Sequence, residues 1–339
     1  MKKILIFTGF PPVPWNLSYS KQNALGGSER AVCYLSEQFS KNYLVYISGN
    51  VIEETIGNIK FINIKSTFEA VNVCHFDHVI VSRYLGFFID FPNLKATKVI
   101  IWAHDTSFVT CNMNNVNITP EDLLTNLGDR ITNCVCLTEW HKNIFIKQYP
   151  MLKNKIEIIN NGIDLSLFKY PTEKVKNSFV YSSRPARGLP RIIELWDDIT
   201  RILPDAILHI ASYVEYTEEY QKLISDKKNV NYLGSLNSQD LYKLMAQSEF
   251  WFYPVCYQET SCITAMEMLQ SEVVCVYYPV AGLVDTLNGH GVQVIPGNEL
   301  NNLLKLNEQT KSILRKRGKE YTTRECSWET AYEKWKKIL

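Results

Sequence analysis

Residues 250–279 constrain the fold more than any other stretch of this chain. Residues 250–255 form a short apolar run rich in aromatic side chains, and residues 273–278 form a second apolar run. Runs of this length predict buried strands. The segment between them has helical periodicity, with Ser261 placed to cap its start. A strand, a loop, a helix and a second strand in this order indicate an α/β sheet.

The predicted helix has a polar side and an apolar side. At about 100° per residue, four polar side chains stack together: Thr260, Thr264, Glu267 and Ser271. The opposite side is apolar and carries Cys262, Ala265, Met266 and Leu269. We expect the apolar side to lie on the sheet. The polar side should then look outward from the carboxyl ends of the strands, where open α/β sheets bind ligands.

Glu259 lies in the loop before this helix, and free backbone N–H groups follow it. A helix N-terminus attracts anions, phosphate above all. This stretch therefore offers a carboxylate in the loop, free amides at the turn and a second carboxylate at Glu267. Together they suit a diphosphate that carries hydroxylated groups at both ends. The alternative is a solvated helix face, because such pairs arise by chance among 35 acidic residues. The strand–loop–helix–strand setting favours the ligand site.

Composition describes a soluble globular protein, and the length of 339 residues favours two domains. The net charge is +1, whereas a duplex-binding protein usually has a basic surplus, so we expect no nucleic-acid partner. The nine cysteines form no C-x-x-C pair, which is typical of reduced thiols. Without a signal-peptide pattern or a membrane-length apolar run, the sequence predicts a cytoplasmic protein.

The first half alternates strands with helices or loops. Apolar runs predict strands at 3–10, 43–48, 60–64, 78–83, 98–102, 131–137 and 156–160. Three prolines at 11, 12 and 14 exclude helix from the loop after the first strand. This loop ends at Gly26 and Gly27, which precede a helix at 30–39 and let backbone approach a phosphate or a sugar closely. Such a pair is also common as a simple turn, and it is not the G-x-G-x-x-G fingerprint of a dehydrogenase.

His104 follows the fifth strand, beside an acid, Asp105, that could orient its ring. We favour a functional role for His104 over that of a structural hydrogen-bonder, whereas His141, within a predicted helix at 139–148, is interpreted as structural. Residues 106–120 have no periodicity and many asparagines, which predicts a surface loop, with the acceptor site as its candidate role.

The second half repeats the alternation after a linker predicted at 165–177. Strands are expected at 179–182, 207–211, 231–234, 250–255, 273–278 and 292–295, with helices at 189–202 and near 217–227 and 238–247. Arg184 and Arg187 lie in the turn after the first of these strands. Two arginines at such a turn can hold a diphosphate in bidentate fashion. A solvated basic turn is the alternative.

At Glu259 and Glu267 the chain resembles the retaining glycosyltransferases of family four, whose Glu-x7-Glu signature these residues match. The chain departs from them at Thr260-Ser261-Cys262, where members often have Gly-Phe-Gly. The resemblance implies the GT-B fold, an α/β architecture of two doubly wound Rossmann-like domains facing each other across a cleft. Residues 1–168, joined by a terminal helix at 327–339, would form the acceptor-side domain, and residues 169–326 the domain for the nucleotide-sugar donor.

The resemblance also implies roles for particular residues. Glu259 and His104 would lie by the donor sugar, and Glu267 would bind the nucleotide ribose. The expected catalytic set is His104, Arg184, Arg187 and Glu259. The expected donor-binding set is Gly26, Gly27, Arg184, Arg187, Leu236, Glu259, Thr260, Ser261, Cys262, Ile263, Thr264 and Glu267.

The resemblance implies a retaining hexosyltransferase that uses a nucleotide diphosphate sugar, and the spread of donors in the family makes GDP-mannose the first choice and UDP-glucose the second. The acceptor would be a hydroxyl of a glycan, glycoprotein or glycolipid. We expect neither a metal, because no Asp-x-Asp motif occurs, nor a cofactor. The alternatives are a non-catalytic nucleotide-sugar or glycan-binding module of the same fold, and a phosphorylase with pyridoxal phosphate on a lysine. The sequence does not determine the oligomeric state, and a homodimer is compatible with it. At most peripheral membrane contact is expected, through Lys334, Lys336 and Lys337.

Overall fold

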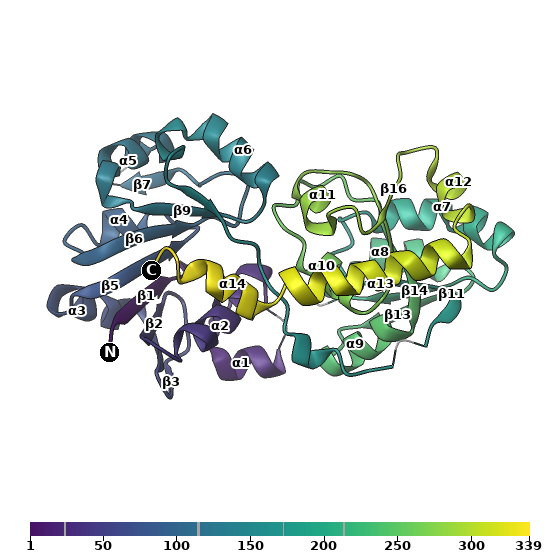
Figure 1. Ribbon diagram of the computed structural model, residues 1–339, viewed down its shortest axis with the longest axis horizontal. Coiled ribbons are helices and arrows are strands. Elements are labelled where there is room, and N and C mark those ends of the chain that lie inside the picture. The colour runs from purple at the N-terminus through teal and green to yellow at the C-terminus, as the bar shows by residue number, and fades with distance from the viewer. Residues whose placement is uncertain (24, 114–115, 172, 213) are drawn as a thin grey trace. The chain divides into compact units, whose positions relative to one another are not determined.

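The computed structural model describes residues 1–23, 25–113, 116–171, 173–212 and 214–339. The chain forms two compact units (Figure 1). Unit 1 comprises Met1–Gly162 and Trp328–Leu339, and unit 2 comprises Ile163–Ser327. The sequence placed these limits at 168/169 and 326/327. Each unit is an α/β structure built on its own sheet.

The sheet of unit 1 has β1 (Lys3–Phe7) in its interior. Its order is β10-β9-β6-β5-β1-β2-β4-β3, and its strands pair in parallel except at β3, which runs antiparallel to β4. The strand order therefore reverses between β1 and β5, the kind of place where doubly wound sheets bind ligands. The remaining strands are β2 (Leu44–Ser48), β3 (Glu54–Ile56), β4 (Ile59–Ile62), β5 (Phe76–Ser82), β6 (Ala96–Trp102), β9 (Asn133–Cys136) and β10 (Ile156–Ile158).

Helices of unit 1 cover the sheet, whose strands bury apolar side chains in two separate clusters. The helices are α1 (Leu17–Gln22), α2 (Gly27–Phe39), α3 (Ile64–Val73), α4 (Phe87–Asp90), α5 (Pro120–Leu127), α6 (Glu139–Gln148) and α14 (Trp328–Trp335). The helix α14 returns from the end of the chain to unit 1 (Figure 1). Its Trp328 and Trp335 are buried, and they contact Tyr34 and Phe39 of α2 with ring centroids 5.7 and 5.9 Å apart.

Unit 2 contains a parallel sheet in the order β13-β12-β11-β14-β15-β16. This is the strand order of the Rossmann fold, which reverses here between β11 and β14. The strands are β11 (Val175–Tyr181), β12 (Ile207–Ala211), β13 (Val230–Gly234), β14 (Ser248–Tyr253), β15 (Val274–Tyr277) and β16 (Val292–Gln293).

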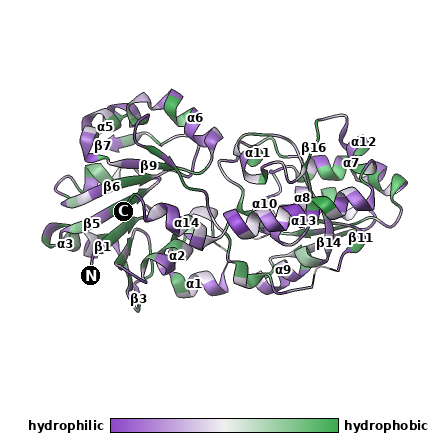
Figure 2. Ribbon diagram, viewed as in Figure 1, coloured by the Kyte–Doolittle hydropathy of each residue, from purple (hydrophilic) through white to green (hydrophobic). Residues whose placement is uncertain are grey.

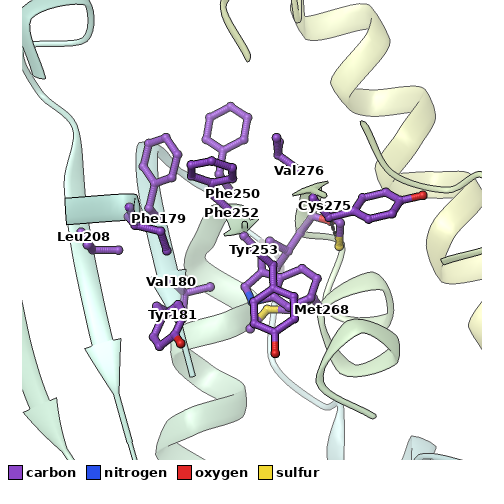
Figure 3. Close-up of a cluster of buried hydrophobic side chains, with 14 of the residues drawn as sticks. Phe179, Val180, Tyr181, Leu208, Phe250, Phe252, Tyr253, Met268, Cys275 and Val276 are labelled. Atoms are coloured by element: carbon purple, nitrogen blue, oxygen red, sulfur yellow. Dashed lines mark hydrogen bonds between the residues drawn. The ribbon is translucent and has the colours of Figure 1, made fainter. Parts of the chain in front are cut away.

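The core of unit 2 lies on this sheet. Figure 3 shows its aromatic centre, where Phe179 of β11 stacks on Phe250 of β14 with centroids 5.0 Å apart. The helices are α7 (Leu189–Ile202), α8 (Glu218–Ser225), α9 (Ser238–Gln247), α10 (Ile263–Gln270), α11 (Gly282–Leu287), α12 (Glu299–Leu304) and α13 (Glu308–Glu325). In Figure 2 the hydrophobic colour marks the strands, whereas α13 is largely hydrophilic.

Three predictions about irregular segments were wrong. The predicted loop 106–120 contains two short paired strands, β7 (Cys111–Met113) and β8 (Val116–Ile118), although its residues 114–115 lie outside the described residues. The prolines exclude helix only locally, because α1 begins soon after them, capped by Asn16. The predicted linker 165–177 ends inside β11, which begins at Val175, and its residue 172 also lies outside the described residues.

Within the described ranges, no helix is long and apolar enough to cross a bilayer. All nine cysteines of the sequence are free thiols in the structure.

Candidate functional site

Two turns of unit 2 meet where its strand order reverses. One follows β11 and leads to α7, and the other follows β14 and leads to α10. Gly188 ends the first turn with φ +100°, and a Cβ built on it would lie 2.8 Å from the carbonyl oxygen of Pro254. Only glycine accepts both this backbone conformation and such a close approach. Gly188 therefore lets the two turns come into contact.

Arg187 and Glu259 join these turns by an ion pair. The Nη1 of Arg187 donates to Oε1 of Glu259 over 2.8 Å, and the hydroxyl of Tyr253 donates to the same oxygen over 2.9 Å. Both donors reach the same carboxylate oxygen. The Glu259 carboxylate is thus oriented through Oε1.

The electrostatics of Glu259 reflect two opposing effects. Burial raises the pKa of Glu259 above its usual value, whereas the charge of Arg187 and the hydrogen bond from Tyr253 act to lower it. Only 6% of Glu259 is exposed, so its carboxylate depends on these two donors in place of water. The guanidinium of Arg187 also lies over the exposed ring of Tyr257, 4.8 Å from its centroid, in cation–π geometry.

Arg184 lies in the same turn as Arg187 but is exposed. Its backbone carbonyl accepts a 2.6 Å hydrogen bond from the hydroxyl of Tyr181, at the end of β11. Tyr181 and Tyr253 extend from the neighbouring strands β11 and β14 (Figure 3), with ring centroids 6.5 Å apart. The structure therefore brings Arg187 to Glu259 and places Arg184 at the outer side of the turn.

The start of α10 differs from the prediction. Cys262, not Ser261, is the N-cap residue, and no side chain caps the helix. The N–H of Cys262 donates to Oγ1 of Thr286 over 3.3 Å, whereas the buried Oγ of Ser261 has no hydrogen-bond partner among the described residues. Thr260 is buried at the end of the same turn, and the first residues of α10, Ile263 and Thr264, are half-buried.

The prediction that the polar side of α10 looks outward was wrong. Glu267 and Ser271 are each only 3% exposed. Glu267 accepts a 2.8 Å hydrogen bond from the hydroxyl of Tyr242, which belongs to α9. Other elements therefore cover this side of α10. Glu259 and Glu267 therefore each accept a hydrogen bond from a buried tyrosine, Tyr253 of β14 and Tyr242 of α9 respectively.

The other predicted site residues lie elsewhere. Leu236 is half-buried in the turn after β13, which is separated from β11 by β12. Gly26, Gly27 and His104 belong to unit 1. Gly26 is the N-cap of α2 and Gly27 is its first residue.

His104 lies just after β6 in unit 1, with its ring centroid 4.5 Å from that of Trp102. Burial and the nearby charge of Arg83 hold the pKa of His104 well below its usual value, so its imidazole is neutral at physiological pH. The neighbouring Asp105 directs its carboxylate to Arg83 through contacts of 2.6 and 2.9 Å. His141 donates from Nε2 to the Asp105 carbonyl over 2.9 Å and accepts at Nδ1 from Leu137, in agreement with a structural role.

The sequence analysis did not identify Tyr242, Tyr253 or Arg83 as candidate site residues. Tyr253 is part of an apolar run, and its position as the last residue of β14 was the signal that distinguishes it from core aromatics. Arg83 likewise ends the run that became β5. Among the described residues, no group of three or more His, Cys, Asp or Glu is arranged to hold a metal ion.

Comparisons with known proteins give a family match to part of the chain and several similar structures. Residues 165–323 match the family described as glycosyl transferases group 1. A sucrose-phosphate synthase from Thermosynechococcus elongatus is similar in structure, at 13% identity and TM-score 0.71, over 100% of this chain and 98% of that one. Anabaena HepE in complex with UDP-glucose has 13% identity and TM-score 0.72, over 100% and 99%. A glycosyltransferase from Rickettsia africae has 14% identity and TM-score 0.72, over 99% and 97%.

No curated protein matches the sequence at a significant level. The structural similarities, all at low identity, establish the fold, and the family match covers nearly all of unit 2. The chain therefore has the GT-B fold, and its second unit is similar to group 1 glycosyltransferases over residues 165–323.

Proposed function

We propose that this protein is a retaining glycosyltransferase that transfers a hexose from a nucleotide diphosphate sugar to an acceptor hydroxyl. The observation that carries the proposal is the Arg187–Glu259 ion pair at the reversal point of the unit 2 sheet. It lies within the segment that matches the group 1 family. A cation and a carboxylate held side by side there suit a diphosphate and the hydroxyl groups of its sugar.

In this proposal Arg187, with Arg184 in the same turn, stabilises the negative charge that develops on the leaving diphosphate. Arg187 uses Nη1 on Glu259, and a guanidinium has five N–H donors in all, so it can bind both groups at once. Glu259 would accept hydrogen bonds from sugar hydroxyls at Oε2, because its Oε1 already receives two donors. Glu267, oriented by Tyr242, would accept from the ribose.

Thr260, Ser261, Cys262, Ile263 and Thr264 complete the proposed donor site at the start of α10. Gly26, Gly27, Leu236 and His104 keep the donor-side roles that the sequence analysis gave them. The donors to test first are GDP-mannose and UDP-glucose; a structure similar to this chain, HepE, was solved with UDP-glucose. The acceptor is a hydroxyl of a glycan, glycoprotein or glycolipid.

The second candidate is a non-catalytic nucleotide-sugar-binding module of the same fold. One observation favours it: the N–H of Cys262 at the start of α10 is occupied by Thr286, so it is not available to a phosphate. The two candidates differ in turnover rather than in binding. Release of nucleoside diphosphate in the presence of acceptors would favour the enzyme, whereas binding without turnover across a broad acceptor panel would favour the module.

Calorimetric titration of GDP-mannose, UDP-glucose and the corresponding nucleoside diphosphates tests the proposal. Loss of a charged hydrogen-bond partner costs about 1.5–3 kcal/mol, so Arg187→Ala should weaken binding about tenfold or more. Arg201→Ala is the matched control, because Arg201 lies at the other end of α7 in an exposed pair with Asp198. Equal affinity of wild type and Arg187→Ala for all four ligands would refute the assignment of the site.

A further inference from the structure

Arg83 lies at the reversal point of the unit 1 sheet, directly after β5. Its backbone has φ +69°, a conformation that non-glycine residues rarely adopt. Such a conformation persists where surrounding contacts fix it, and it is concentrated at functional sites. The contacts of the Arg83 side chain supply this constraint.

The Arg83 guanidinium contacts segments from two other parts of unit 1. Nε and Nη2 bind the two carboxylate oxygens of Asp105 over 2.6 and 2.9 Å, which is a bidentate pair. Nη1 donates to Oγ of Ser28 over 3.0 Å and lies 4.0 Å from Oε1 of Glu29, both in the first turn of α2. The side chain of Arg83 therefore connects the glycine turn at Gly26 to the segment after β6.

Asp105 is fixed from two sides as a result. Its carboxylate is held by Arg83, and its backbone carbonyl accepts from Nε2 of His141 in α6. His104 is the residue immediately before it, so these two contacts fix the backbone that carries the His104 imidazole. We propose that Arg83 is a positioning residue for His104, acting through Asp105 and the first turn of α2.

The proposal has an electrostatic consequence. Arg83 after β5 and His141 of α6 are charged or titratable groups that act on His104. Tyr84, Asp105 and Glu29 of α2 act in turn on Arg83. The charge of Arg83 lowers the pKa of His104, and Arg83 also compensates the charge of Asp105. His104 would therefore meet the sugar as a neutral hydrogen-bonding group. This role rests on the function proposed above.

Four variants test the inference: Arg83→Gln, Arg83→Lys, Asp105→Asn and the double variant Arg83→Gln/Asp105→Asn. The first readout is the proton NMR titration of the His104 ring in the ligand-free protein, assigned with His104→Gln. Arg83→Gln removes the cation and leaves the charge of Asp105 uncompensated, so the pKa of His104 should rise. Adding Asp105→Asn should reverse part of this rise, whereas Arg83→Lys should preserve the neutral ring.

The second readout is donor turnover against pH. We expect Arg83→Gln to lose roughly 10- to 100-fold in kcat with little change in donor KM, and its acidic limb to move to higher pH. Arg83→Lys should keep the pH profile but lose part of kcat, because it cannot form the bidentate pair. Lys155→Gln is the control; it removes the cation of the Lys155–Asp129 pair elsewhere in unit 1 and should leave both readouts unchanged.

The two readouts separate this inference from the proposed function. Absence of transfer by the wild type would refute the function, while the NMR titration would still report whether Arg83 controls His104. A folded Arg83→Gln variant in which His104 titrates as in the wild type would overturn the inference. So would an equal loss of kcat in Arg83→Gln and Lys155→Gln, which would indicate a merely structural effect.

Discussion

Arg187 and Glu259 are 72 residues apart in the sequence, yet their side chains meet over 2.8 Å at the reversal point of the unit 2 sheet. Glu259 is almost fully buried, whereas about a third of the Arg187 side chain is exposed. A buried carboxylate needs its partners, because an uncompensated buried charge is strongly unfavourable. The pair therefore links the stability of the two turns to their proposed chemistry.

Replacing Glu259 should separate sugar transfer from nucleotide binding. Glu259→Gln keeps the volume and an acceptor for Tyr253 but removes the charge that pairs with Arg187. We expect a large loss of transfer and a smaller change in the affinity for the bare nucleoside diphosphate, which does not reach the sugar site. Glu194→Gln, at an exposed pair on α7, is the control. Equal losses of transfer and of diphosphate affinity would contradict this assignment.

Glu267 should behave differently from Glu259. Because its proposed partner is the ribose, Glu267→Gln should weaken the binding of nucleotide and nucleotide sugar alike, by about tenfold for a loss of ~1.5 kcal/mol. Tyr242→Phe removes the hydrogen bond that orients Glu267 and should reproduce part of this loss. Calorimetry with both ligand types checks the prediction. A loss confined to the nucleotide sugar would move Glu267 from the ribose to the sugar.

Gly188 should be intolerant of substitution. Gly188→Ala would require φ +100° of an alanine and place its Cβ 2.8 Å from the backbone of Pro254. We expect a loss of roughly 2–4 kcal/mol in the free energy of unfolding, measured by urea denaturation, together with weaker donor binding. Gly297→Ala is the control, because Gly297 has φ +86° but no atom within 4 Å of an added Cβ. It should lose only about 1–2 kcal/mol. Equal losses in both variants would argue against contact between the turns.

The stability of unit 1 should fall as the pH falls below about 6.5. Burial lowers the pKa of His141 to about 4, so the unfolded chain binds this proton more readily than the folded one. The contribution of His141 to the free energy of unfolding is fully present above its pKa in the unfolded chain, about 6.5, and is lost as the pH falls toward 4. This loss amounts to about 3 kcal/mol for the single residue.

Urea denaturation of wild type and His141→Gln at several pH values measures this dependence. In the folded protein Nδ1 of His141 accepts a hydrogen bond from the N–H of Leu137. Protonation of Nδ1 would place two N–H groups against each other, and this is the physical origin of the loss of stability. The variant lacks the titrating group, so its stability should depend less on pH, whatever its absolute value. Identical slopes for both proteins would show that His141 is not responsible.

Much of the fold could be predicted from the sequence where periodicity is strong. The bounds of α7 and β12 were predicted to the residue, because an amphipathic helix and a buried strand each have a clear repeat. The pair β7–β8 was not predicted, since strands of three residues carry no usable alternation. The start of α10 was misplaced by one residue. Serine is a preferred N-cap residue, so Ser261 was predicted there, but the N-cap position is occupied by Cys262.

The candidate site was predictable only in part. Arg187 and Glu259 were each assigned to a segment that follows a strand, and the structure brings their side chains together. Tyr253 and Tyr242 were not found, because a tyrosine in an apolar segment looks like core until its hydroxyl partner is known. The burial of Glu267 was also missed, since helix periodicity gives a polar side but not the element that covers it.

Activity should not depend on a divalent metal. The proposed stabilisation of the leaving diphosphate comes from Arg184 and Arg187, which supply positive charge without a metal ion. Transfer should therefore survive excess EDTA, and Arg187→Ala should lower the rate far more than chelation does. Loss of activity on chelation that is restored by Mn²⁺ would mean that the diphosphate is held in another way.

The anomeric configuration of the donor should be retained in the product. An inverting enzyme needs a base on the face opposite the leaving group to deprotonate the acceptor as it attacks. The residue to consider for that role is His104, and its low pKa makes it a weak base. A retaining reaction on one face of the sugar needs no such base, because the leaving diphosphate, held by Arg184 and Arg187, would accept the proton of the acceptor.

His104→Ala should therefore slow transfer without abolishing it, whereas loss of an obligatory base would be close to complete. The decisive measurement is NMR of the glycosidic linkage formed from an α-linked donor, because the one-bond coupling between C1 and H1 distinguishes α from β for mannosides and glucosides alike. An α-linkage together with residual activity of His104→Ala agrees with a front-face reaction. A β-linkage would assign His104 as the general base and would require a different role for the charge that Arg83 and Asp105 place around it.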